Sequence, residues 1–392
     1  MNILIDSLCC GNSMYGVSRV LLEHLRRLAG PAHPDVRIYL IVSKENRAQF
    51  EVKGVTPILF PFSLRRRGVS FPLQLLWERV ALPRLVKRLS IDVFLRPNLA
   101  WFQPMPCPQA VFIHDLAEYH PRGGLQYSRL RRIYRRLAAA RNVRLADRVL
   151  TVSEHAAQEI RQRFRIQTDR VSVIHNGPPE LAPRASIGQD AGACFLTVGK
   201  LLLHKNHMIL CRAYVAADKA SRLRAPLILI GGDGNAAEQL RAYVSGEGYA
   251  DRILFPGYVA EAEVQTRYRH ALAFLFPSWY EGFGLPILEG MAHGVPVVSS
   301  NKACLPEVAG IAAMLLDPGS VDAWAKAIGD IDAGRIDLEG MARRGFDNLK
   351  RFSWDDSSAK LAGILGTLTD KNSKDTRADR ARADGSAQKE KA

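Results

Sequence analysis

The chain contains 392 residues, of which 47% are hydrophobic and 24% are charged. This balance is typical of a soluble globular protein, and the length predicts two domains. No apolar run approaches the roughly 20 residues that span a bilayer, and the start MNILIDSL lacks the basic and long apolar segments of a signal peptide. The six cysteines show no metal-type spacing such as CxxC, which predicts reduced thiols in a cytoplasmic protein.

The positive charge is concentrated in one half of the chain. Residues 1–180 carry 28 Lys and Arg against 14 Asp and Glu, a net charge of +14, whereas the whole chain has a formal net charge of +15. A field of this kind attracts anions. The first half is therefore expected to meet an anionic membrane surface, a phosphorylated acceptor or nucleic acid.

Short apolar runs alternate with helix-like patterns, which is the signature of parallel sheets wound with helices. A stretch rich in Pro, Gly and Ala predicts a linker at 179–193. The expected α/β architecture is two Rossmann-like domains, 1–178 and 194–352, which face a cleft at the carboxyl ends of their strands. The expected strands lie at 2–5, 37–42, 92–95, 110–114 and 148–153, and then at 194–199, 226–232, 273–278 and 296–300.

Two further segments complete the chain. Residues 353–369 place Trp354, Leu361 and Leu365 at helical spacing, which predicts an amphipathic helix packed on another element, expected to be the N-terminal domain. Residues 370–392 are almost wholly charged or small. Such a composition cannot bury enough apolar surface to fold, so a disordered tail is expected.

The segment YEGFGLPILEG places Glu281 and Glu289 on either side of an apolar, glycine-rich stretch. Pro286 suits the first turn of a helix, and Gly282 allows a ligand to approach the backbone. Unpaired N–H groups at the helix start favour an anion, and the two carboxylates can accept hydrogen bonds from hydroxyls. A phosphorylated sugar fits this combination. The spacing leaves open the alternative that Glu289 only complements the positive helix end.

The longer stretch FPSWYEGFGLPILEGMAHGVPVV resembles the Glu-x7-Glu segment of the family-4 retaining glycosyltransferases of GT-B fold. Within this family the chain looks most like the bacterial mannosyltransferases of surface-polysaccharide assembly. The resemblance covers roughly residues 1–368. Other segments agree in the same order along the chain: VFIHDL (111–116), ADRVLTVSEHAAQEI (146–160), VIHNG (173–177), VGKLLLHKNH (198–207), FPGYV (255–259) and LPEVAG (305–310).

The resemblance implies roles for individual residues. Glu281 would contact hydroxyls of the donor sugar, Glu289 would hold the ribose of the nucleotide, and His114 would contact the donor sugar and shape the reactive geometry. Catalytic roles are expected for Glu281, His114 and Lys205. The expected donor-binding residues are Gly16, Gly199, Lys200, Lys205, Gly257, Tyr258, Phe283, Gly284, Leu285 and Glu289.

Two lysines in GKLLLHK, Lys200 and Lys205, could neutralise a leaving diphosphate without a metal. The family pattern usually has arginine where this chain has Lys200, and a lysine keeps the charge but loses the two-pronged geometry. An ordinary basic loop is the alternative. Asp330 and Asp332 form an Asp-x-Asp pattern away from this site, which we interpret as coincidence. No metal or other cofactor is expected.

The stretch YSRLRRIYRRLAAARNVRL predicts an arginine-rich amphipathic helix with Arg129, Arg132 and Arg136 on one side. Such a helix can lie on anionic lipid or meet an anionic acceptor. The alternative is an ordinary solvated face. An absence of interleaved exposed aromatic residues is expected, and with the lack of a recognised nucleic-acid motif it argues against nucleic acid as a partner.

The sequence thus predicts a cytoplasmic, peripherally membrane-bound hexosyltransferase that acts with retention on a nucleotide sugar. GDP-mannose is the expected donor and a lipid-linked or otherwise anionic glycan the expected acceptor. A UDP-hexose donor is the main alternative. A sugar-nucleotide epimerase of GT-B fold and a noncatalytic polyanion-binding protein are the rivals from other classes.

Overall fold

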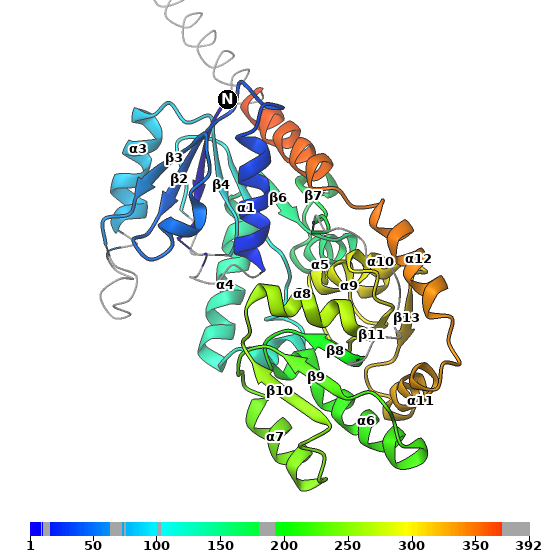
Figure 1. Cartoon of the computed structure of the whole chain (residues 1–392). Helices are drawn as coiled ribbons and strands as arrows, with labels where there is room; N and C mark the ends of the chain where they lie inside the picture. The colour runs from blue at the N-terminus through cyan, green and yellow to red at the C-terminus, as the bar shows by residue number, and fades with distance from the viewer. Residues whose placement is uncertain are drawn as a thin grey trace, which may run out of the picture.

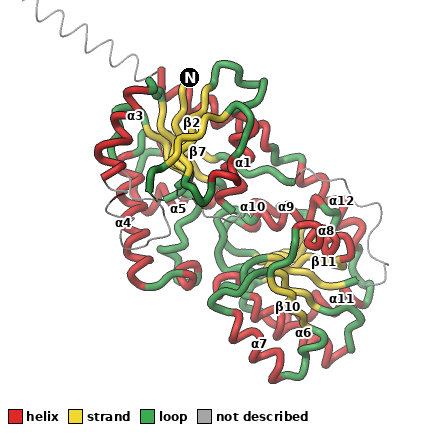
Figure 2. The backbone as a smooth tube through the Cα atoms, turned by 60° about the vertical axis from the view of Figure 1, so that its left-hand side comes forward, coloured by secondary structure: helices red, strands yellow, loops and turns green. Residues whose placement is uncertain are grey.

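The structure is a computed structural model that describes residues 1–8, 10, 16–62, 73, 76–99, 103–179 and 193–370. Within this part of the chain, two parallel sheets form the centres of two lobes, as both views show (Figures 1 and 2). The tail predicted at 370–392, apart from residue 370, which ends the last helix, and nearly all of the predicted linker lie outside the described residues.

Both sheets are entirely parallel, and helices cover their faces, which confirms the predicted pair of Rossmann-like domains. The first sheet has the order β3-β2-β1-β4-β5-β6-β7 and the second the order β10-β9-β8-β11-β12-β13. The strands of the first sheet are β1 (Asn2–Asp6), β2 (Arg37–Val42), β3 (Val55–Leu59), β4 (Val93–Arg96), β5 (Gln109–Phe112), β6 (Arg148–Thr151) and β7 (Val171–Val173). Those of the second are β8 (Cys194–Val198), β9 (Leu227–Ile230), β10 (Ile253–Gly257), β11 (Ala271–Phe276), β12 (Val297–Ser300) and β13 (Ala313–Leu316).

The nine strands expected from the sequence are the nine interior strands of the two sheets. The four strands that the sequence analysis missed, β3, β7, β10 and β13, are the four sheet edges. An edge strand has a neighbouring strand on one side only and is less buried than an interior strand. Its sequence therefore needs no continuous apolar run. Pro57 in β3 and Pro256 in β10 are tolerated for the same reason, since an edge strand can lack a ladder donor.

Helices lie between most of the successive strands, and two more follow the last strand. Those of the first domain are α1 (Val17–Leu28), α3 (Leu82–Arg88), α4 (Arg129–Leu145) and α5 (Glu154–Phe164). Those that follow are α6 (His207–Ser221), α7 (Ala237–Gly246), α8 (Glu261–His270), α9 (Leu285–Ala292), α10 (Leu305–Ala309), α11 (Val321–Asp332) and α12 (Leu338–Leu349). No helix in the described ranges has both the length and the apolar character needed to cross a membrane.

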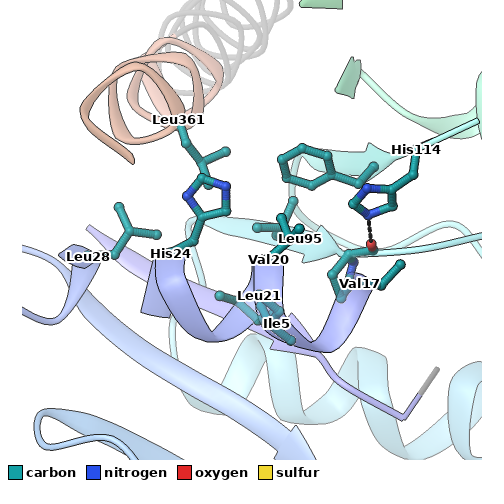
Figure 3. A pocket seen from close by; sticks show the side chains of 11 residues that line it. Ile5, Val17, Val20, Leu21, His24, Leu28, Leu95, His114 and Leu361 are labelled. Atoms are coloured by element: carbon teal, nitrogen blue, oxygen red, sulfur yellow. Dashed lines mark hydrogen bonds between the residues drawn. The ribbon is translucent and has the colours of Figure 1, made fainter. Parts of the chain in front are cut away.

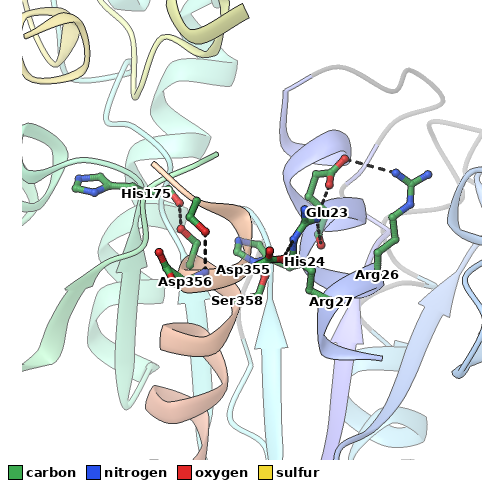
Figure 4. Close-up of polar contacts among 10 residues, drawn as sticks. Glu23, His24, Arg26, Arg27, His175, Asp355, Asp356 and Ser358 are labelled. Carbon is green, nitrogen blue, oxygen red and sulfur yellow. Dashed lines mark hydrogen bonds and ion pairs between the residues drawn. The ribbon is translucent and has the colours of Figure 1, made fainter. Parts of the chain in front are cut away.

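A last helical segment, residues 354–370, returns to the first domain and lies beside α1 (Figures 1 and 4). His24 Nδ1 lies 2.9 Å from Ser358 Oγ, and Arg27 donates to Asp355 over 2.6 Å. Leu361 is fully buried and helps to close a pocket between α1 and the first sheet that has room for about one water molecule (Figure 3).

The order of the strands fixes where a ligand can bind. In the second sheet β8 is flanked by β9 and β11, so the connections after β8 and β11 leave in opposite directions and open a crevice between them. In the first sheet β1, between β2 and β4, marks the equivalent position. Ligands of parallel α/β sheets bind at such switch points. The loops that follow β1 and β4 in the first sheet and β8 and β11 in the second therefore lie at the expected ligand-binding edges.

Candidate active site

Glu281 and Lys205 meet at the switch point of the second sheet. Lys205 follows β8 and Glu281 follows β11, and Lys205 Nζ lies 2.9 Å from Glu281 Oε1. Ser278 Oγ donates to the same oxygen over 2.9 Å. Both side chains of the ion pair are mostly buried, with 15% and 18% of their surface exposed. The Glu281 carboxylate is therefore held in one position before any ligand arrives.

The surroundings of Glu281 keep it ionised. Burial raises the pKa of this carboxyl, but the charge of Lys205 and the hydrogen bonds from Lys205 and Ser278 outweigh burial. The pKa of Glu281 therefore lies below its usual value, and the group is an acceptor for hydroxyl hydrogens at neutral pH.

The loop between Glu281 and α9 presents unpaired backbone donors. Gly284 is the N-cap of α9 with φ 98°, a left-handed conformation that favours glycine, and Pro286 lies in the first turn. No described residue accepts a hydrogen bond from the N–H groups of Phe283, Gly284 or Leu285. These donors, at the positive end of the helix, form a site suited to a phosphate group.

Glu289 lies in the second turn of α9 and forms an ion pair with the other domain. Arg19, in the first turn of α1, lies 2.6 Å from Glu289 Oε1 through its Nη1 atom. Burial raises the pKa of Glu289, and the nearby Glu261 adds to this effect. The charge of Arg19 lowers the pKa but does not bring it back to its usual value. Arg19 could not be predicted as a site residue, because a contact between residues 270 positions apart leaves no local pattern in the sequence.

His114 lies directly beside the glutamate loop. Gly282 approaches it so closely that a Cβ atom at position 282 would lie 2.2 Å from the His114 carbonyl oxygen. The ring stacks on Phe112, and its Nε2 lies 2.9 Å from the Pro97 carbonyl oxygen (Figure 3). Because a carbonyl only accepts, Nε2 carries the hydrogen and Nδ1 is the acceptor. Burial lowers the pKa of His114, so the ring is neutral at neutral pH.

Three glycines line the ends of neighbouring strands in the second sheet. Gly199 donates to the Ile230 carbonyl at the end of β9, and Gly231 donates to the Gly257 carbonyl at the end of β10. A Cβ at Gly231 would lie 2.1 Å from the Gly199 carbonyl oxygen. The predicted donor-site residues Gly199 and Gly257 are thus linked through Gly231, which the sequence analysis did not select.

The remaining predicted donor-site residues have different surroundings. Lys200 and Tyr258 are exposed, the latter with 71% of its surface accessible. The side chain of Phe283 is buried against His175 and Phe352, so only its backbone faces the site. Gly16 caps α1 in the first domain with φ 58°, three residues before Arg19.

The three arginines predicted to form a patch on α4 differ in their surroundings. Arg129 is exposed. Arg136 turns toward its own domain, where it donates to the Glu118 carbonyl over 2.9 Å and covers the ring of Tyr119. Arg132 lies against Gly124. The helix thus uses some of its arginines to attach itself to the domain, and a patch formed by all three remains a prediction.

Asp330 and Asp332, interpreted as a coincidental motif, have structural partners. Asp330 is paired with Lys326 and Arg335, and Asp332 accepts from the backbone N–H groups of Arg224 and Ala225. In the described part of the chain, no three His, Cys, Asp or Glu side chains come together as metal ligands do.

Two further residues that the sequence analysis missed join the domains. The Tyr280 hydroxyl donates to Glu159 over 2.6 Å and accepts from the Leu116 N–H. Glu307, in α10, accepts from the first two N–H groups of α5 and lies 3.1 Å from His175 Nε2. Both residues lie inside segments that resemble the family, YEGFG and LPEVAG. This resemblance was the sequence feature that could have pointed to them.

Comparison with known proteins identifies the family. The first domain matches the model for Glycosyltransferase Family 4 at residues 14–178, and the second matches that for Glycosyl transferases group 1 at residues 192–331. The chain is 33% identical over 270 residues to O-antigen chain mannosyltransferase B of Escherichia coli, which covers 65% of this chain and 69% of that protein. The chain belongs to the family-4 glycosyltransferases.

Other relatives agree with this assignment. The glycosyltransferase is 28% identical over 256 residues to the O-antigen chain mannosyltransferase RfbU of Salmonella typhimurium, which covers 63% and 69% of the two chains. Sucrose-phosphate synthase from Thermosynechococcus elongatus has the same GT-B fold, with a TM-score of 0.73, 17% identity and 94% and 99% coverage. Anabaena HepE, solved with UDP and glucose, superposes with a TM-score of 0.65, 16% identity and 94% and 100% coverage.

We predict that Glu281→Gln and Lys205→Ala each lower turnover of the glycosyltransferase by roughly 10²-fold or more, since each removes a preorganised charge from a mostly buried site. Steady-state rates and circular dichroism melting would measure activity and folding. Lys219→Ala is the matched control, because Lys219 pairs with Glu247 at an exposed position. A wild-type rate in either site variant would show that the ion pair is not part of the active site.

We predict that Arg19→Ala tightens nucleotide binding, because Arg19 occupies the carboxylate that the family resemblance assigns to the ribose. A partly exposed ion pair contributes about 1 kcal/mol or less, so the gain is at most about fivefold. Calorimetric titration with GDP and UDP would measure it, with Arg26→Ala, on the exposed side of the same helix, as control. An affinity loss of roughly tenfold would mean that Arg19 contacts the nucleotide itself.

Proposed function

We propose that the protein transfers mannose with retention from GDP-mannose to a glycan or lipid-linked acceptor in the synthesis of a cell-surface polysaccharide. The observation that carries this proposal is the Lys205–Glu281 pair beside the unpaired N–H groups at the start of α9. The 33% identity to an O-antigen chain mannosyltransferase supports mannose as the sugar and a surface glycan as the setting.

The proposed reaction uses the geometry of both domains. Glu281 accepts hydrogen bonds from sugar hydroxyls, and Glu289 accepts them from the ribose. The diphosphate binds at the N–H groups of residues 283–285, and Lys205 offsets the negative charge that develops as the bond to the sugar breaks. The acceptor hydroxyl attacks from the face that the diphosphate leaves, and the departing phosphate oxygen takes its proton. Neutral His114 orients the sugar through hydrogen bonding.

A UDP-hexose is the second candidate donor, and it is favoured by one observation. Anabaena HepE, which shares the fold over 94% of this chain, was solved with UDP and glucose. The carboxylate at Glu289 would accept hydrogen bonds from the ribose of either nucleotide, because the ribose is common to both. The choice of base and sugar therefore has to be measured.

The protein is proposed to act at the inner face of the cytoplasmic membrane as a peripheral enzyme. The net charge of +14 over residues 1–180 is suited to anionic headgroups and to a lipid-diphosphate acceptor. The mannosyltransferase relatives act on O-antigen chains, as their names state.

We predict that the purified protein slowly hydrolyses GDP-mannose and releases GDP, whereas UDP-glucose and UDP-N-acetylglucosamine yield little nucleotide. Chromatographic measurement of released nucleotide, with the Glu281→Gln variant as the blank, would give the rates. Release of UDP instead would select the second candidate. If every donor stayed intact and calorimetry detected binding of neither GDP nor UDP, the assignment of the donor site would be wrong.

We predict that turnover is unchanged by EDTA, because Lys205 and the start of α9 supply the positive charge that the leaving diphosphate needs. The rate with the preferred donor would be compared before and after chelation and after magnesium or manganese is restored. A complete loss of activity that the metal reverses would refute the metal-independent mechanism.

A further inference from the structure

The first half of α4 exposes a row of apolar side chains. Leu130, Ile133, Tyr134 and Leu137 follow the i, i+3, i+4, i+7 spacing that places residues on one helix face. Their exposed fractions are 81%, 55%, 39% and 57%. We call these four residues the α4 stripe. Single exposed apolar residues are common, but a contiguous row on one helix indicates an interaction surface.

The polar side of this half of the helix faces the protein. Arg135 pairs with the fully buried carboxylate of Glu118 over 3.2 Å, and Arg136 donates to the Glu118 carbonyl. The usual arrangement of an amphipathic helix is therefore reversed here: the charged side is attached to the domain and the apolar side faces outward. The buried contacts of α4 come from its second half, at Ala138, Ala139, Asn142 and Val143.

The charges around the α4 stripe indicate what covers it. The helix contains seven arginines and no acidic residue. Arg129 and Arg131, which are next to Leu130 in the sequence, are both exposed, and so is Arg144 near the helix end. A second copy of the chain on this face would bring two such helices together and place like charges side by side. A nucleic acid would meet the arginines but would leave the apolar row uncovered. An anionic lipid surface satisfies both features.

The segment just before α4 contacts loops of the second domain near the active site. Asn235, from the second domain, donates to the Leu125 carbonyl over 2.8 Å, and the Arg122 guanidinium lies 4.3 Å from the centre of the Trp279 ring. Trp279 is two residues from Glu281. The helix extends from this contact along the outside of the first domain (Figures 1 and 2). A bilayer bound at the α4 stripe would therefore lie close to the cleft.

We propose that the α4 stripe inserts into the acyl region at the surface of an anionic bilayer while the neighbouring arginines contact lipid phosphates. This inference deepens the membrane contact within the proposed function by naming the residues that make it. It differs from the sequence-based expectation, which assigned the contact to the arginine side of the helix.

The test is co-sedimentation of the full-length protein with vesicles of phosphatidylcholine, alone or mixed with phosphatidylglycerol. We expect the wild type to bind the mixed vesicles, and the combined variant Leu130→Ser, Ile133→Ser, Leu137→Ser to bind at least about tenfold more weakly, since it removes the side chains that would leave water. Ile311→Ser is the matched control, because Ile311 is 89% exposed in the second domain, away from α4. This control is expected to bind as the wild type does.

Insertion is tested separately from folding with single tryptophan substitutions. Leu130→Trp and Ile311→Trp would each be mixed with vesicles whose acyl chains carry bromine, and fluorescence would be compared with that of the wild type. We expect quenching of the tryptophan at 130 but not of that at 311. Lipid binding by the combined serine variant at wild-type strength, or an unquenched tryptophan at 130, would overturn the proposal.

Two other outcomes are informative. If light scattering found the wild type to be a dimer and the serine variant a monomer, with no vesicle binding by either, the α4 stripe would be a subunit interface and the proposal would be wrong. If the wild type bound lipid through the stripe but transferred no sugar, the proposed reaction would fail while this inference stood. The vesicle readout requires no donor and no acceptor, so the two failures are distinguishable.

Discussion

The active site depends on how closely the backbones of the two domains approach each other at Gly282. There is no room for a side chain at this position, because a Cβ atom would overlap the His114 carbonyl oxygen at 2.2 Å. Ser153, from the first domain, donates to the Gly282 carbonyl over 2.8 Å and completes the contact. The loop that carries Glu281 is thus fixed by both domains. Any ligand bound between Glu281 and His114 meets groups whose relative positions are set by backbone contacts.

Each of the two site glutamates pairs with its own cation, and the two pairs differ in whether they join the domains. The Lys205–Glu281 pair lies within one domain and has an added hydrogen bond from Ser278. The Arg19–Glu289 pair joins two domains. A ligand that displaces Arg19 must supply hydrogen-bond donors to Glu289, because this carboxylate would otherwise be left without a partner. Binding at Glu289 therefore competes with an ion pair between the domains, whereas the ion pair of Glu281 lies within the second domain.

Much of the fold could be predicted from the sequence, because interior strands of parallel sheets are continuous apolar runs. The edges could not, since strands such as β3 and β7 are short, half exposed or interrupted by proline. In the site, the strand–loop–helix pattern located Glu281 and the start of α9. Arg19 and Tyr280 act through contacts between distant segments, which no local spacing encodes. On α4 the periodicity gave two faces correctly, but it could not tell which one turns to the domain.

The positive charge of the first domain does not come from exposed arginines alone. Several arginines donate to backbone carbonyls rather than to carboxylates: Arg136 to Glu118, and Arg170 to the last carbonyls of α4 at Val143 and Ala146. Such bonds stabilise a helix end, but a carbonyl is neutral and leaves the charge of the guanidinium uncompensated. These arginines therefore hold the fold together and still contribute to the positive field. The exposed apolar face of α4 lies within that field, which is the combination that an anionic bilayer can satisfy.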